Sequence, residues 1–114
     1  MITVWHNPKC SKSREALKLL EEKGCDFGVV KYLEETPSRG EIEALLQKLG
    51  ISARELMRTK EELYKELELA KVTDEATLID ALAEHPRLIE RPVLIEGNRA
   101  VIGRPAEKVI EFLG

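Results

Sequence analysis

The sequence predicts an α/β domain built on a mixed four-stranded sheet with a central helical insertion. Three observations predict this fold. First, the chain begins with a short apolar strand pattern, an amphipathic helix pattern and a second apolar strand pattern. Second, its middle part carries repeated helix-capping boxes. Third, its last part holds two strand patterns followed by a helix pattern. A strand–helix–strand crossover makes the first two strands parallel, and a hairpin adds an antiparallel pair. The expected order is therefore βαβ, a block of helices, then ββα.

The first three elements are expected over residues 2–6 (strand), 11–23 (helix) and 27–33 (strand). Gly24 is expected to end the helix, because glycine readily adopts the left-handed conformation that closes many helices. The crossover between the two strands is long enough to hold this helix and is expected to be right-handed.

Capping boxes mark the starts of three helices in the middle of the chain. The Ser/Thr-x-x-Glu pattern begins at Ser38, Ser52 and Thr59. In such a box the hydroxyl and the carboxylate each accept a backbone N–H that has no partner within the helix. Asp74 is expected to cap a fourth helix in the same way. These helices form an insertion over about residues 38–86. Their expected inward residues are Ile42, Leu45, Leu46, Leu49, Leu56, Met57, Leu63, Leu67, Leu78, Ile79 and Leu82.

The last part of the chain returns to strands. Residues 92–95 and 99–102 are expected to pair as a hairpin through Gly97-Asn98. A Gly-Asn dipeptide between two strands favours a tight hairpin turn. The final helix is expected to start at Pro105, a residue favoured at the first helical position. Its expected inward residues are Ala106, Val109, Ile110 and Leu113.

Composition limits the class of protein. Residues 1–114 are enough for one domain that buries a core without disulfides or metals, and 43% hydrophobic with 34% charged residues is typical of a soluble globular protein. The net charge of −3, with Glu and Lys interleaved, differs from the massed basic surface of a nucleic-acid binder. No stretch has the ~18–20 apolar residues of a membrane span, and no secretory signal is seen. We therefore expect a cytoplasmic monomer with neither nucleic acid nor membrane as a partner.

Cys10 lies where the first strand passes into the first helix. The first N–H groups of a helix lack intrahelical partners and carry the positive end of its dipole, so they favour a thiolate and any anion nearby. Lys9, Lys12, Arg14 and His6 add charges or donors with the same preference. We predict that Cys10 is a nucleophile with a lowered pKa, next to an anion site.

Neither a second reactive cysteine nor a metal site is expected beside Cys10. Cys25 follows Gly24, with no basic residue directly after it, so a packing role is favoured over a resolving thiol. A cytosolic location disfavours a structural disulfide between the two cysteines. A metal site needs three or four ligands, whereas His6 and Cys10 have few possible companions, so no metal is expected.

The order of elements is similar to that of the thioredoxin fold, with a cysteine at the first strand–helix junction and an Arg91-Pro92 step before the third strand. This resemblance implies a cis peptide bond at Pro92, packed against the Cys10 loop. X-Pro bonds are the ones that adopt cis readily.

Six short motifs extend the resemblance to a family. Their order and spacing resemble those of the glutaredoxin-coupled arsenate reductase (ArsC) family from end to end. The motifs are His-Asn-Pro-x-Cys at 6–10, Ser-Arg at 13–14, Tyr-Leu-Glu at 32–34, Leu-Met-Arg at 56–58, Glu-Arg-Pro at 90–92 and Gly-Arg-Pro at 103–105.

The resemblance implies reduction of arsenate to arsenite through a thioarsenate on Cys10. Glutathione and glutaredoxin would be the reductants, with no bound cofactor. By position, Arg58, Arg91 and Arg104 match the arginines that hold the oxyanion. Guanidinium suits this role because its planar fork donates to two oxygens at once.

Two further residues are assigned by position in the same way. His6 matches the histidine that keeps the cysteine ionised, and Ser13 matches the hydroxyl beside it. The residues around Cys10 by themselves predict an anion site. The resemblance adds the three arginines, His6 and Ser13 as the side chains that would form this site.

Other functions fit the sequence less well. A phosphatase loop needs Cys-x5-Arg, but residue 16 is Ala16, and a dithiol oxidoreductase needs Cys-x-x-Cys, but residue 13 is Ser13. Spx-type regulators, which bind RNA polymerase without catalysis, are similar to ArsC in fold and remain an alternative. The resistance reductases have Gly-Thr-Ser after the cysteine and Thr-Pro-Pro later, whereas this chain has Ser-Lys-Ser at 11–13 and Thr-Pro-Ser at 36–38. A glutathione-linked reaction on another substrate therefore stays open.

Overall fold

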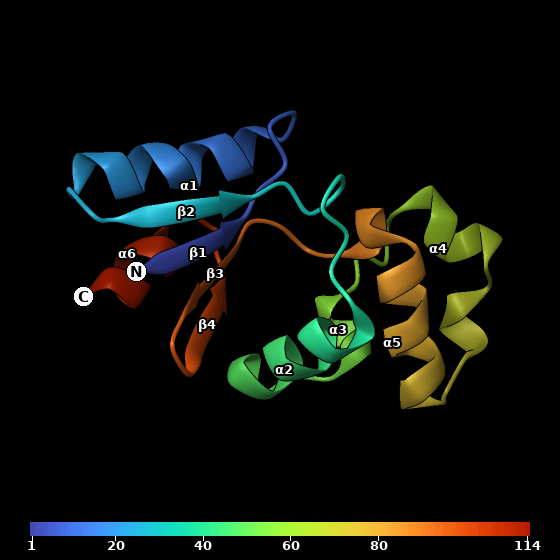
Figure 1. Cartoon of the computed structure of the whole chain (residues 1–114). Helices are drawn as coiled ribbons and strands as arrows, with labels where there is room; N and C mark the ends of the chain where they lie inside the picture. Colours follow the sequence, from blue (N-terminus) through green and yellow to red (C-terminus); the bar gives the residue numbers. More distant parts are fainter. The chain divides into compact units, whose positions relative to one another are not determined.

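The computed structural model describes all 114 residues and divides the chain into two compact units. The sheet unit consists of Met1–Glu35 and Arg91–Gly114, and the helical unit is Thr36–Glu90. The strands lie in the first unit, whereas the second consists of helices and turns with one isolated β-bridge between Met57 and Ile89 (Figure 1). The predicted insertion over residues 38–86 falls within the helical unit.

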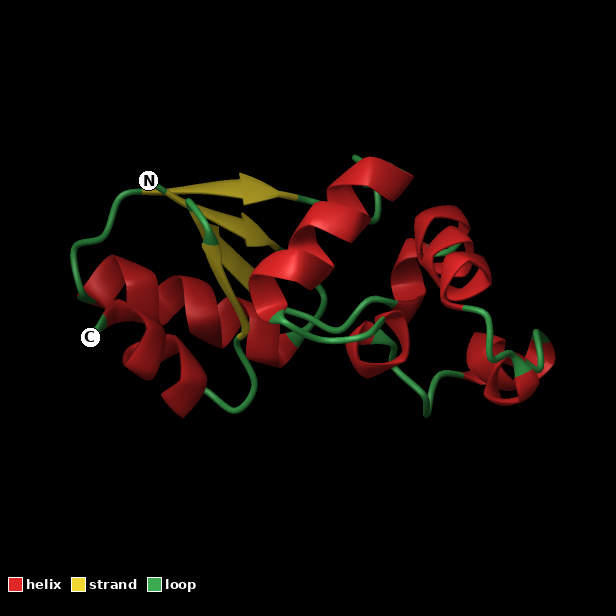
Figure 2. Ribbon diagram, turned by 90° about the horizontal axis from the view of Figure 1, so that it is seen from below, coloured by secondary structure: helices red, strands yellow, loops and turns green.

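The sheet unit holds one mixed four-stranded sheet, as predicted. Its strands are β1 (Ile2–Trp5), β2 (Phe27–Val30), β3 (Val93–Glu96) and β4 (Arg99–Ile102). Their spatial order is β2-β1-β3-β4, with β1 parallel to β2 and antiparallel to β3, and β3 antiparallel to β4 (Figure 1). Figure 2 draws these strands in yellow. The β3–β4 turn contains Gly97 with a φ of 58°, a left-handed conformation that glycine adopts without strain.

Two helices cover one face of this sheet. The helices α1 (Ser11–Glu22) and α6 (Glu107–Leu113) contact each other and share a core with the strands. Gly24 follows α1 in the left-handed conformation, at a φ of 68°, as expected for a helix end. The buried core residues are Ile2, Val4, Ala16, Leu20, Leu94, Val109 and Phe112, and the side chain of Cys25 packs against their edge.

The last helix differs from its prediction in start and orientation. It begins at Glu107 rather than Pro105, and it buries Phe112 while leaving Ile110 47% exposed. Val109 and Phe112 are three residues apart and therefore lie on one helix face, which places Ile110 at the edge of that face. Leu113, four residues after Val109, also packs against this core, as predicted.

The helical unit contains four α-helices and two 3-10 turns. The α-helices are α2 (Arg39–Leu49), α3 (Ala53–Leu56), α4 (Glu62–Glu66) and α5 (Glu75–Glu84), and the 3-10 turns are η1 (Leu69–Lys71) and η2 (Pro86–Leu88). Helices α2 and α3 both pack against α5. No helix in either unit has the length and apolar character needed to cross a membrane.

The predicted helix starts at Ser38, Ser52 and Asp74 are confirmed. The Ser38 hydroxyl accepts the Glu41 N–H at 3.1 Å, and the Glu41 carboxylate accepts the Ser38 N–H at 3.1 Å. Asp74 accepts the Thr77 N–H at 3.2 Å at the start of α5. Such caps satisfy N–H groups that the first helical turn leaves unpaired, so the starts of α2 and α5 can be predicted locally.

The prediction for Thr59 is wrong. Helix α4 begins at Glu62, preceded by Glu61, and Thr59 lies in a turn before it. The Arg58 N–H donates to the Leu88 carbonyl at 2.7 Å, so a contact distant in sequence fixes the backbone next to Thr59. The later start also changes the buried face. Tyr64 is buried in α4, whereas the expected inward residue Leu67 is 40% exposed.

Candidate functional site at Cys10

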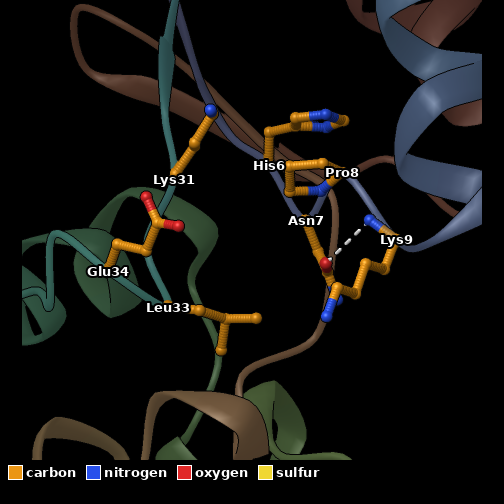
Figure 3. Close-up of a pocket in the computed structure, with 7 residues that line it drawn as sticks. All are labelled: His6, Asn7, Pro8, Lys9, Lys31, Leu33 and Glu34. Atoms are coloured by element: carbon orange, nitrogen blue, oxygen red, sulfur yellow. Dashed lines mark hydrogen bonds between the residues drawn. The ribbon is translucent and has the colours of Figure 1, made fainter.

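The loop between β1 and α1 is shaped by one residue, Asn7. Its N–H donates to the Ser13 hydroxyl oxygen, its side-chain Oδ1 accepts the Lys9 N–H and its carbonyl accepts the Cys10 N–H, each at 3.0 Å. The bond between Asn7 and Lys9 is drawn in Figure 3. Three hydrogen bonds from one residue therefore fix the backbone that presents Cys10.

Cys10 is the residue directly before the first turn of α1, and its side chain is buried. Burial by itself raises the pKa of the thiol. The Ser13 N–H, a hydrogen bond and the positive charge from Arg91, and the Lys12 N–H together outweigh burial, so the pKa of Cys10 is lowered. The direction agrees with the prediction made from its place at a helix N-terminus.

Arg91 contributes more than this interaction with Cys10. Its Nε and Nη1 atoms are buried and have no hydrogen-bond partner in the structure. Buried charged donors without partners are costly, and a group of this kind in a native fold calls for an explanation. A guanidinium with two unpaired donor atoms next to a thiolate matches the needs of an oxyanion, whose oxygens accept charge-assisted hydrogen bonds.

His6 and Ser13 form a buried pair next to the loop. The His6 Nδ1 atom lies 2.6 Å from the Ser13 Oγ atom, and Ser13 is fully buried. Burial, followed by the positive charges of Lys31 and Arg14, lowers the pKa of His6. His6 is therefore uncharged near neutral pH, and its link to Cys10 runs through Ser13 rather than through a positive charge.

The Arg91–Pro92 peptide bond is cis, as the resemblance implies, and the Arg104–Pro105 bond is cis as well. Pro92 is buried, and its carbonyl accepts the Gly103 N–H at 2.8 Å. A Cβ atom on Gly103 would lie 3.0 Å from Val109 and 3.1 Å from Pro92. Gly103 therefore permits a close approach of the chain to Pro92.

The remaining predicted arginines are placed differently. Arg104 is an exposed residue of the sheet unit. Arg58 belongs to the helical unit, where its Nη1 atom lies 2.8 Å from Glu61, and Glu61 also pairs with Arg87 at 2.8 Å. The structure thus joins Arg91 to Cys10, while oxyanion binding by Arg58 and Arg104 stays a prediction.

A cavity of about 240 Å³ lies beside the loop. One side consists of His6, Asn7, Pro8 and Lys9, and the other of Lys31, Leu33 and Glu34, which follow β2 (Figure 3). No group of three or more His, Cys, Asp or Glu residues is arranged to hold a metal ion.

Sequence comparison decides the family. The ArsC family matches residues 5–112 of the chain. The chain belongs to the ArsC family. This ArsC-family chain is 48% identical to an arsenate reductase of Haemophilus influenzae over 98% of each chain, and 50% identical to the uncharacterized protein YfgD of Escherichia coli over 99% of this chain and 97% of that protein. The structure of an arsenate reductase from Vibrio cholerae superimposes with a TM-score of 0.93 at 51% identity, covering 96% of this chain and 95% of that one.

The match with the Vibrio cholerae structure confirms the thioredoxin-like α/β fold. Two features of this ArsC-family site were not predicted from the sequence. The first is the set of three hydrogen bonds made by Asn7. The only sequence signal for it is the Asn7-Pro8 pair, which favours a turn. Lys31 lies next to His6 because β2 is parallel to β1, a relation that depends on strand register.

Proposed function

We propose that this chain reduces arsenate to arsenite, with Cys10 as the nucleophile and with glutathione and glutaredoxin as reductants. The observation that carries the proposal is the guanidinium of Arg91, which bonds to Cys10 and has two buried donors without partners. Relatives about half identical to this chain are named arsenate reductases, which supports arsenate as the oxyanion. We expect the protein to act as a cytoplasmic monomer without a bound cofactor.

The first step is capture of the oxyanion. Arsenate carries negative charge on oxygens that accept charge-assisted N–H bonds, and the Nε and Nη1 atoms of Arg91, which have no partner in the protein, supply such donors. Arg104 and Arg58 are proposed to complete the oxyanion site. The Glu61 pair of Arg58 would then have to open or be shared when the anion binds.

The second step is attack of the Cys10 thiolate on arsenic. A sulfur–arsenic bond forms, one arsenic–oxygen bond breaks, and the departing oxygen takes up protons and leaves as water. Arsenic remains As(V) in this thioarsenate. Negative charge grows on the remaining oxygens during the attack, and the fixed charge of Arg91 stabilises it.

The third step transfers two electrons from thiols outside the protein. Two thiols are oxidised to one disulfide while As(V) becomes As(III), so one arsenate and two thiols yield arsenite, a disulfide and water. A second cysteine at residue 13 could supply one of these thiols, but the chain has Ser13 there. Glutathione attacks the adduct, and glutaredoxin then removes the oxidised thiol.

The proposal is tested by arsenate-dependent NADPH oxidation coupled through glutathione reductase, with glutathione and glutaredoxin present. Wild type should consume NADPH only when arsenate is added, and Cys10→Ser should abolish this. Cys25→Ser is the matched control, because Cys25 packs against the core edge and should leave the rate unchanged. Activity that persists in Cys10→Ser would disprove the mechanism, and activity lost in Cys25→Ser would point instead to a resolving thiol.

A further inference from the structure

The cavity beside the loop carries charges that the proposed arsenate chemistry does not use. Lys31 and Glu34 lie on one side, and Lys9 lies on the other (Figure 3). All three residues are exposed, while Leu33 and Pro8 add apolar surface. The cavity thus combines two positive charges, one negative charge and an apolar contact next to the segment that ends in Cys10.

We infer that this cavity binds the glutathione that reduces the Cys10 adduct. The inference rests on the proposed function, and it assigns the co-substrate to a place distinct from the oxyanion. Glutathione is a tripeptide with two carboxylates, one ammonium and a central thiol. Its formal charges are therefore complementary to those of the cavity, group by group.

The arrangement of the charges favours one orientation of the tripeptide. The γ-glutamyl end carries a carboxylate and an ammonium on the same carbon, which matches the opposite charges of Lys31 and Glu34 on one side. The glycine end carries a single carboxylate, which matches Lys9 on the facing side. The cysteine between the two ends then lies along the loop, with its sulfur toward Cys10.

The size and net charge of the cavity support the same ligand. Its volume of about 240 Å³ is below the ~300–1,000 Å³ of pockets for drug-sized molecules, so it suits part of a small, partly exposed ligand. Two lysines and one glutamate line the cavity, so its net charge is positive. His6 adds no charge to this sum near neutral pH, because burial and Lys31 lower its pKa. A net positive cavity favours glutathione, whose charges sum to minus one while its thiol is protonated.

Direct binding tests the inference without any turnover. S-methylglutathione cannot react through sulfur, and its dissociation constant for the whole protein can be measured by calorimetry. Lys31→Met should weaken binding about tenfold or more, as expected for a lost charge-assisted contact. Lys23→Met is the matched control, because it removes an exposed lysine at the far end of α1 and should change nothing. Equal affinity of Lys31→Met and wild type would overturn the inference.

A second measurement tests the orientation. An S-methylglutathione analogue that lacks the α-amino group should bind wild type more weakly than the parent, because Glu34 loses its partner. Glu34→Gln should bind the two compounds equally. If Glu34→Gln distinguishes them as strongly as wild type does, the assigned orientation is wrong and the inference fails.

Kinetics separate this inference from the proposed function. In the coupled assay, Lys31→Met should raise the KM for glutathione and leave the KM for arsenate within twofold. A rise in the KM for arsenate alone would make the cavity part of the oxyanion site and overturn the inference. If wild type binds S-methylglutathione as expected but never reduces arsenate, the arsenate proposal fails while the tripeptide site stands.

Discussion

Replacement of Arg91 by Met should make the ligand-free protein more stable and abolish its response to oxyanions. Methionine has a similar length but no donors, so the variant keeps most of the packing and removes the two buried nitrogen atoms that lack partners. Their desolvation is a cost that the folded chain bears without a ligand. The same change removes the hydrogen bond and charge that favour the Cys10 thiolate.

The expected magnitude follows from these opposing effects. Each unpaired buried donor costs about 1–3 kcal/mol, and a hydrogen bond to a charged partner contributes about 1.5–3 kcal/mol. Removing two such donors while losing one such bond leaves a net gain of about 2 kcal/mol in the free energy of unfolding. In a domain of this size that gain raises the Tm by roughly 8 °C.

Urea denaturation of wild type and Arg91→Met, each with and without arsenate or sulfate, checks this reasoning. Wild type should gain stability from the anion, and Arg91→Met should start higher and gain nothing. Lys18→Met, which removes an exposed charge on α1, should stay within about 0.5 kcal/mol of wild type. If Arg91→Met is less stable than wild type and still responds to the anion, the unpaired donors are not the anion site.

Three other predictions concern the same unit. Because folding lowers the pKa of Cys10, the stability advantage of wild type over Cys10→Ser should be complete above the ordinary thiol pKa of about 8.5. It should decline as the pH falls through the pKa of Cys10 in the folded protein. Urea titrations across pH measure this difference, and a difference that does not change with pH would contradict the prediction. Because the pKa of His6 is also lowered, wild type should lose stability as pH falls below about 6.5, and His6→Gln should remove this slope; an unchanged slope would assign it to another group. Gly103→Ala should cost about 1–3 kcal/mol, since its Cβ would crowd Val109 and Pro92; a calorimetric Tm equal to that of wild type would show that the neighbours yield freely.

Features of the fold that depend on neighbouring residues were predictable from the sequence. The capping box at Ser38, the cap at Asp74 and the turn at Gly97 all arise from contacts a few residues apart. Thr59 shows the limit of this reasoning. Its box pattern is intact, yet the backbone bond between Arg58 and Leu88 holds the segment in another conformation. A tertiary contact, rather than the local capping pattern, therefore determines where the helix after Thr59 begins.

The candidate site divides in the same way. A lowered pKa for Cys10 follows from its place at a helix start, and that place is visible in the sequence. The two unpaired donors of Arg91 are not visible, because they depend on how the surrounding chain buries the guanidinium. The lowered pKa of His6 likewise depends on burial and on Lys31, which strand pairing brings near.

The strand order has a consequence for how the chain emerges from the ribosome. Strand β1 lies between β2 and β3 and pairs Trp5 with Val93, so its second edge waits until nearly the whole chain has been synthesised. During this interval the edge presents unpaired N–H and C=O groups that can pair with other chains. The helical unit, by contrast, is one continuous stretch of sequence, Thr36–Glu90, and its contacts can form as it appears. Nascent chains stalled before β3 should therefore aggregate through β1, whereas those extended past β4 should not.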